Sequence, residues 1–123
     1  MDDEELVRDV VGGMLEYIGY EVVHAQDGAE AIELYRRASK SDQPFDTVIM
    51  DLTVPGGMGG REAISQLLSL DPNVKALISS GYSDDPIMSS YQEFGFRGVV
   101  SKPCKIEDLD RILQEIIVGR ELL

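Results

Sequence analysis

The sequence predicts an α/β fold in which helices cover both faces of a doubly wound parallel sheet. Short, continuously apolar runs, typical of strands buried on both faces, alternate with longer segments that have the apolar spacing of amphipathic helices. The expected order starts with a helix and runs α-β-α-β-α-β-α-β-α, which is typical of this fold class. Because 123 residues suit one compact domain, we expect residues 1–123 to form a single domain.

Four apolar runs are expected to form the strands: 21–25 (EVVHA), 47–51 (TVIMD), 75–79 (KALIS) and 98–101 (GVVS). None of them alternates between apolar and polar residues, as a strand with one face in water would. They therefore favour a parallel sheet that is buried on both faces.

Helices are expected where the apolar residues recur at helical spacing. The stripe within residues 7–18 predicts the first helix, and the stripe within 109–117, at i, i+3, i+4, i+7 and i+8, predicts the last. A weaker helix is expected after Gly28, within the DGAE segment at 27–30, whose acid and glutamate have capping-box spacing. Further weak helices are expected after Gly60 and Pro86.

The composition narrows the class of protein. The formal net charge of -12 argues against a nucleic-acid surface, because binding phosphates requires clustered Lys and Arg. No apolar run approaches the roughly 20 residues of a membrane span, and no secretory signal is visible. The single cysteine, Cys104, cannot form an internal disulfide. We therefore expect a cytoplasmic domain with no nucleic-acid partner and no membrane contact.

Polar residues gather where the predicted strands end, which is where the functional crevice of a doubly wound sheet lies. The residues at these ends are Asp2, Asp3, Asp51, Ser79, Ser80 and Lys102. Clustered carboxylates favour a hard cation such as Mg²⁺, and a lysine beside them suits a phosphoryl oxygen. The set therefore has the parts for phosphoryl transfer onto a carboxylate, with Asp51 as the nucleophile.

The chain resembles a response-regulator receiver domain, a family with a flavodoxin-like fold. The resemblance rests on DDE (2–4), MDLTVPGGMGG (50–60), SSGYS (79–83) and SKP (101–103), which stand in the family's order and spacing. It covers essentially the whole chain. Each motif alone is weak, and the combined set is specific. The second and third motifs resemble the corresponding segments of receivers that are attached to hybrid sensor histidine kinases.

This resemblance implies a magnesium site with Asp51 as the phosphoacceptor. Asp3 would be a direct Mg²⁺ ligand together with Asp51, and Asp2 would hold the metal through water. The backbone carbonyl of Thr53 would complete the protein's share of the coordination.

The resemblance also implies how the phosphoryl group is held. Lys102 would pair with it, and Ser80, rather than Ser79, would supply a hydroxyl. The Lys102–Pro103 peptide bond is expected to be cis. At Val99, many receivers have an aromatic switch residue, so we do not expect output to depend on such a switch here.

The first strand of the sheet departs from the family's architecture. In receivers the DDE motif ends the first, central strand, which would lie between 21–25 and 47–51, but here that strand is reduced to Met1. We expect the chain to begin at an internal methionine of a longer parent. An open central position would leave backbone groups unpaired, so we expect something to fill it. The candidates are upstream residues, a segment exchanged from a second copy to form a dimer, or collapse of the neighbouring strands.

The implied function is a phosphoacceptor signalling domain. It would take a phosphoryl group from a histidine kinase or a histidine phosphotransfer protein onto Asp51, in a Mg²⁺-dependent reaction, and signal by protein–protein contact. It would catalyse only its own phosphorylation and dephosphorylation, although it could be part of a histidine kinase.

Three other functions remain open. A degenerate receiver would bind partners without phosphorylation. A phosphatase of the haloacid-dehalogenase kind would need a second aspartate where Thr53 stands. FMN capture would need a phosphate loop where Asp2 and Asp3 stand, and these acids would repel phosphate.

Overall fold

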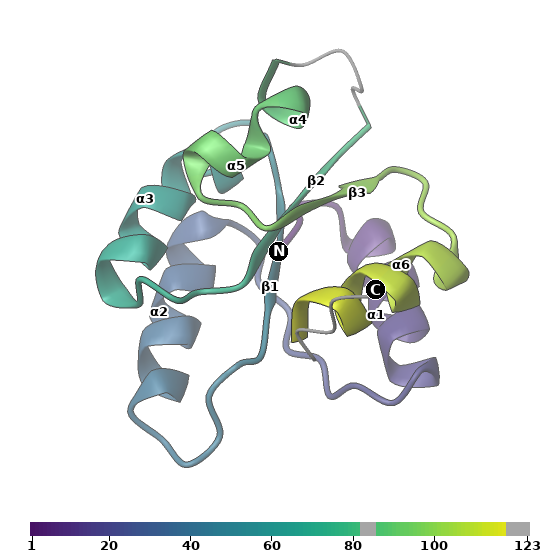
Figure 1. Cartoon of the computed structure of the whole chain (residues 1–123), viewed down its shortest axis with the longest axis horizontal. Helices are drawn as coiled ribbons and strands as arrows, with labels where there is room; N and C mark the ends of the chain where they lie inside the picture. The colour runs from purple at the N-terminus through teal and green to yellow at the C-terminus, as the bar shows by residue number, and fades with distance from the viewer. Residues whose placement is uncertain (82–85, 118–123) are drawn as a thin grey trace.

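The computed structural model describes residues 1–81 and 86–117, which form a parallel sheet with helices on both sides (Figure 1). The elements are α1 (Glu5–Tyr17), α2 (Gly28–Ser39), β1 (Val48–Asp51), α3 (Gly60–Leu70), β2 (Ala76–Ser80), α4 (Pro86–Ser89), α5 (Tyr91–Phe94), β3 (Gly98–Ser101) and α6 (Ile106–Ile117). The three strands that form within this part of the chain are parallel and lie in the order β1-β2-β3. The predicted fold class is confirmed.

Two apolar clusters attach the helices to the sheet. On one side, Met50 and Ile78 belong to the same buried cluster as Leu67 of α3. On the other side, Leu77 belongs to a cluster with Leu113 of α6 and with the apolar stripe of α1. Figure 1 shows α2 and α3 on one face and α1 and α6 on the other. The strands are therefore buried on both faces, as their continuous apolar runs predict.

Residues 21–25 do not form the strand that the sequence predicts. The neighbour that they would pair with, the central strand, is reduced to Met1. The one backbone hydrogen bond between the two segments runs from the Asp2 N–H to the Ala25 carbonyl, at 3.1 Å. An apolar run forms a strand only where a second strand offers a hydrogen-bonding ladder, so this prediction is wrong.

Met1 lies where the central strand would end. Its ammonium group donates to the Ile49 carbonyl at 2.6 Å, and the Asp51 N–H donates to the Met1 carbonyl at 2.9 Å. These two bonds are the pattern of a single residue in a parallel ladder. The rest of the central position is a cavity of about 820 Å³. The neighbouring segments have therefore not collapsed onto each other.

The weak helix expected after Pro86 is two single turns instead. Helix α4 begins at Pro86 and ends at Ser89. Ser90 is not helical, and α5 starts after it. Gly95, with a φ of 101°, ends α5 in the left-handed conformation that glycine adopts most readily. The expected cap of α2 is present, because the Asp27 side chain accepts a hydrogen bond from the Glu30 N–H at 2.9 Å.

Two glycines bring the start of α3 against the end of β1. A Cβ at Gly59 would overlap the Leu52 carbonyl oxygen, and one at Gly60 would lie 2.9 Å from the Asp51 carbonyl oxygen. The Gly59 N–H donates to the Glu62 side chain at 3.1 Å, which caps the helix. Glycine at these two positions therefore lets the start of α3 pack directly against the backbone at the end of β1.

Substituting Gly59 by alanine is expected to lower the free energy of unfolding by about 1–3 kcal/mol, because backbone atoms must move to admit the new methyl group. Gly13→Ala in α1 is the matched control. A Cβ there meets nothing within 4 Å, and alanine favours the helix by about 0.5–1 kcal/mol. Urea denaturation of the two variants measures both effects. Equal stability of Gly59→Ala and the wild type would contradict this account of the turn.

A hydrogen bond joins α2 to the end of α3. The buried Tyr35 hydroxyl donates to Asp71 Oδ2 at 2.7 Å. Burial raises the pKa of Tyr35, and the Tyr35 hydrogen bond lowers the pKa of Asp71 below its ordinary 3.8. The ionised form of Asp71 is thus favoured in the folded protein, and its contribution to stability is lost as the pH falls through the lowered pKa.

Tyr35→Phe is therefore expected to cost about 0.5–1.5 kcal/mol of unfolding free energy at pH 7. The cost should shrink below pH 3.8, the ordinary pKa of Asp71, as this carboxylate gains its proton. Urea denaturation across this pH range measures the change. Tyr17→Phe is the control, since Tyr17 is 84% exposed and should show no loss. A loss for Tyr35→Phe that is constant with pH would exclude the Asp71 contribution.

Candidate acidic site

The predicted site residues lie together at the carboxyl ends of the strands. Asp51 is the last residue of β1, and Ser80 is the last residue of β2. Lys102 directly follows β3. Asp2 and Asp3 reach the same edge because Met1 pairs with β1. Segments that are far apart in sequence therefore build one site.

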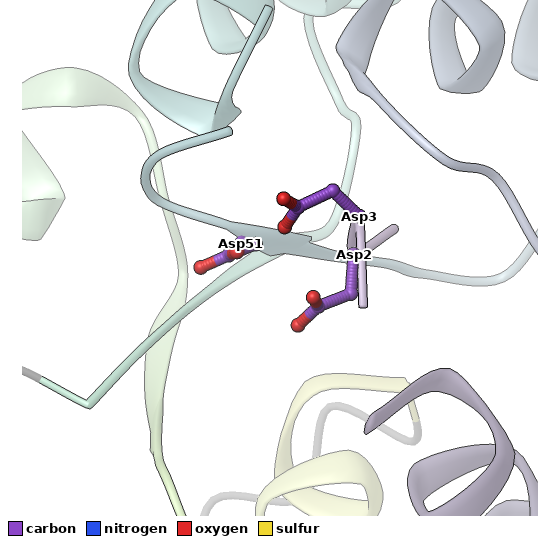
Figure 2. Close-up of side chains that lie close together, drawn as sticks. All are labelled: Asp2, Asp3 and Asp51. Carbon is purple, nitrogen blue, oxygen red and sulfur yellow. The ribbon is translucent and has the colours of Figure 1, made fainter. Parts of the chain in front are cut away.

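Three carboxylates form the centre of this site. Figure 2 shows Asp2 and Asp3 from the N-terminal segment and Asp51 from β1, with their carboxylates pointing to the same side. One oxygen from each lies within 4.8 Å of the others. Asp2 is 6% exposed and Asp51 9%, whereas Asp3 is open to solvent. The cluster thus combines two buried acids with one that a solvent ion can reach.

Asp2 is fixed by hydrogen bonds on several sides. Its N–H donates to the Ala25 carbonyl, and its own carbonyl accepts from the Arg8 guanidinium at 2.6 Å. Its Oδ1 accepts from the Glu4 N–H at 3.0 Å. The N-terminal segment is therefore held at the sheet edge although it forms no strand of its own.

Lys102 bridges the two buried acids. Its Nζ lies 2.6 Å from Asp2 Oδ2 and 3.2 Å from Asp51 Oδ1. Burial alone would lower the pKa of Lys102, but its hydrogen bond to Asp2 and the charges of Asp51 and Asp2 raise it above the ordinary value. The lysine is therefore fully charged at neutral pH. It partly neutralises the site.

The phosphoacceptor candidate carries a raised pKa. Burial is the largest cause for Asp51, and the charges of Asp2 and Asp3 add to it, while Lys102 acts in the opposite direction. Burial also lowers the pKa of the Met1 ammonium group to about 6. Three carboxylates beside one lysine still leave excess negative charge. A hard divalent cation with oxygen ligands fits this donor set.

The remaining predicted residues surround this centre. Ser79 and Ser80 are both buried, and Lys102 N–H donates to the Ser80 carbonyl at 3.2 Å. Thr53 is exposed just beyond the end of β1. The Lys102–Pro103 bond is cis, as predicted.

Val99, Cys104 and Tyr82 lie within three residues of a predicted site residue in the sequence. Val99 lies within β3 and is half-buried. Burial raises the pKa of the Cys104 thiol, which favours its protonated form. Tyr82 lies outside the described residues.

Sequence reasoning missed the groups that support the acids. Arg8 and the carbonyls of Ala25 and Ile49 hold the N-terminal segment in place. Backbone carbonyls leave no trace in a sequence. Arg8 could have been found only from its place one helical turn into α1, where its side chain can reach back to the residues before the helix.

Among the described residues, no helix combines the length and the apolar character needed to cross a bilayer.

Comparisons with known proteins agree with this geometry. The chain is 29% identical to the response regulator GacA of Pseudomonas aeruginosa in an alignment of 125 positions, which covers all of this chain but only 56% of GacA. It is 30% identical over 117 residues to the chemotaxis protein CheY of Thermotoga maritima, covering 91% of this chain and 92% of CheY. The receiver domain of the sensor histidine kinase PA1611 from P. aeruginosa has the same fold, with a TM-score of 0.83 and 24% identity over 96% of this chain and 93% of that domain.

The family model that describes the response regulator receiver domain matches residues 1–114. This match takes in the acids at the chain start, the end of β1 and the lysine after β3. The protein therefore belongs to the response regulator receiver domain family of two-component signal transduction.

Proposed function

We propose that the protein is a phosphoacceptor domain that receives a phosphoryl group on Asp51. The observation that carries this proposal is the convergence of Asp2, Asp3, Asp51 and Lys102 at one edge of the sheet. The phosphodonor is a phosphohistidine of a histidine kinase or of a histidine phosphotransfer protein. The whole of 1–123 acts as one domain in the cytoplasm, and it changes no substrate other than its own aspartate.

The proposed metal is Mg²⁺. Asp3, Asp51 and the Thr53 carbonyl would hold it directly, and Asp2 through water. When bound, it supplies positive charge that offsets the carboxylates and the phosphoryl oxygens. The oxygen-only donor set supports this choice. The similar PA1611 receiver domain was crystallised with a magnesium ion coordinated in its active-site cleft.

The transfer itself is a displacement at phosphorus. A carboxylate oxygen of Asp51 forms the new O–P bond while the P–N bond to the histidine breaks, and the imidazole leaves with the electron pair. Lys102 already lies 3.2 Å from Asp51, so its ammonium group can turn to a phosphoryl oxygen without crossing the site. The Ser80 hydroxyl, at the end of β2, is the second donor to that group.

A second candidate is a degenerate receiver that binds partners without being phosphorylated. One observation favours it: the central position of the sheet is a cavity, and Met1 is the residue of the first segment that pairs with β1. In either case the output is a protein–protein contact. Phosphorylation of Asp51 separates the two candidates.

Incubation with acetyl phosphate and Mg²⁺ is expected to add the mass of one phosphoryl group to the wild type and none to Asp51→Asn, because the amide is not a nucleophile. Asp9→Asn is the matched control, since Asp9 is an exposed acid on α1. It should be phosphorylated like the wild type. Intact-protein mass spectrometry reads the result. Equal incorporation in Asp51→Asn and the wild type would refute the assignment.

Lys102→Ala is expected to keep its Mg²⁺ affinity but to bind beryllofluoride, a phosphoryl mimic, at least about tenfold more weakly. The lysine repels the metal and pairs with the mimic, so the two titrations should separate. Lys105→Ala, which removes an exposed lysine, should alter neither. Calorimetric titration measures both ligands. Loss of Mg²⁺ binding with the beryllofluoride response intact would be the contrary result.

A further inference from the structure

Arg8 reaches back from the first turn of α1 to the acids that precede the helix. Its Nη1 donates to the Asp2 carbonyl at 2.6 Å, in a partly buried contact. Its own N–H donates to the Glu4 carbonyl at 3.0 Å, which is the first backbone bond of the helix. The regular geometry of a helical turn therefore sets where the guanidinium meets the Asp2 carbonyl.

The carbonyl that Arg8 holds belongs to the peptide unit between Asp2 and Asp3. This unit is planar, so a bond that fixes its carbonyl also fixes the directions in which the chain leaves it on both sides. The Asp2 carboxylate has two further partners, the Glu4 N–H at 3.0 Å and Lys102 Nζ at 2.6 Å. Asp3 is exposed, so the direction of its side chain depends on the backbone that carries it.

The charge of Arg8 and its hydrogen bond have opposite effects on a cation at this site. Burial is the largest cause that lowers the pKa of the Met1 ammonium group, and the charge of Arg8 acts in the same direction, so this charge reaches the first segment. A positive charge repels a cation, and its removal alone would tighten metal binding. The hydrogen bond favours binding, because it holds the acids where one cation can contact them together.

We propose that Arg8 is a positioning residue of the acidic site, which orients the Asp2–Asp3 peptide so that both carboxylates face the cation position beside Asp51. Figure 2 shows these carboxylates pointing to the same side. The inference rests on the proposed function in one respect, the Mg²⁺ that the acids would hold. Removing a group that orients metal ligands typically weakens metal binding by about 10- to 100-fold.

The test compares three variants with the wild type. Arg8→Met keeps most of the apolar stem and removes the donor and the charge. Arg8→Lys keeps the charge and one donor group. Arg111→Met is the matched control, because it makes the same change of charge in α6, at a side chain that is 65% exposed. Calorimetric titration measures Mg²⁺ affinity, and NMR order parameters of the Asp3 and Glu4 amides are measured in Mg²⁺-free buffer. The amides of β2 report whether each variant is folded.

Arg8→Met is expected to bind Mg²⁺ about tenfold more weakly than the wild type. Its order parameters at Asp3 and Glu4 should fall from about 0.85 to below about 0.6, with those of β2 unchanged. Arg111→Met should match the wild type, and Arg8→Lys should lie between Arg8→Met and the wild type. Equal or tighter Mg²⁺ binding by Arg8→Met would overturn the proposal, because the charge would then be the whole effect.

The metal-free measurement separates this inference from the proposed function. If the wild type binds no Mg²⁺, the proposed metal is wrong, and the order parameters still decide on Arg8. Lower values at Asp3 and Glu4 in Arg8→Met support the orienting role, and unchanged values overturn it. An equal loss of Mg²⁺ affinity in Arg111→Met would also overturn it, because the effect would then not depend on where the arginine lies.

Discussion

The hydrogen bonds between Met1 and β1 are the contact on which the acidic site depends. They place Asp2 and Asp3 beside Asp51 although residues 1–3 form no strand. The Arg8 guanidinium and the Ala25 carbonyl support the same segment from the other side. Without these bonds the first two acids would belong to a solvated chain end, and Asp51 would stand alone with Lys102.

Bringing these acids together raises the energy of the site. Two of the three carboxylates are buried, and the pKa of Asp51 is raised chiefly by that burial. Lys102 offsets part of the repulsion by contacting Asp2 and Asp51 at once. An added positive charge would therefore stabilise these carboxylates, because opposite charges interact strongly where water is excluded. The electrostatics thus link the fold to the proposed cation and phosphoryl chemistry.

Most of the fold could be predicted from the sequence, because it follows from apolar periodicity. Strands β1, β2 and β3 and the longer helices lie where that pattern indicates. Residues 21–25 form no strand because, among the described residues, the chain start offers them one backbone hydrogen bond and not a ladder. The β-propensity of a segment is a property of that segment alone, whereas a hydrogen-bonding ladder needs two neighbouring strands. The helix predicted after Pro86 does begin there, as α4, but it ends at Ser89 and a second short helix, α5, follows.

The charged residues of the site could be predicted from the sequence, but the contacts that hold them could not. The strand-end rule identified Asp51 and Lys102, and the structure brings them within 3.2 Å. It could not identify Arg8 or the backbone carbonyls that hold Asp2, because these contacts depend on three-dimensional packing alone. Nor could it predict that the central position would remain open as a cavity.

The central claim is that one hard cation binds among Asp2, Asp3 and Asp51. Titrating the protein with Mn²⁺, a paramagnetic ion that accepts the same oxygen ligands, tests it directly by NMR. The account predicts that amide signals of residues 2, 3, 51 and 53 broaden first, and that excess Mg²⁺ restores them. Broadening spread over exposed acids such as Asp9, with Asp51 unaffected, would contradict the account.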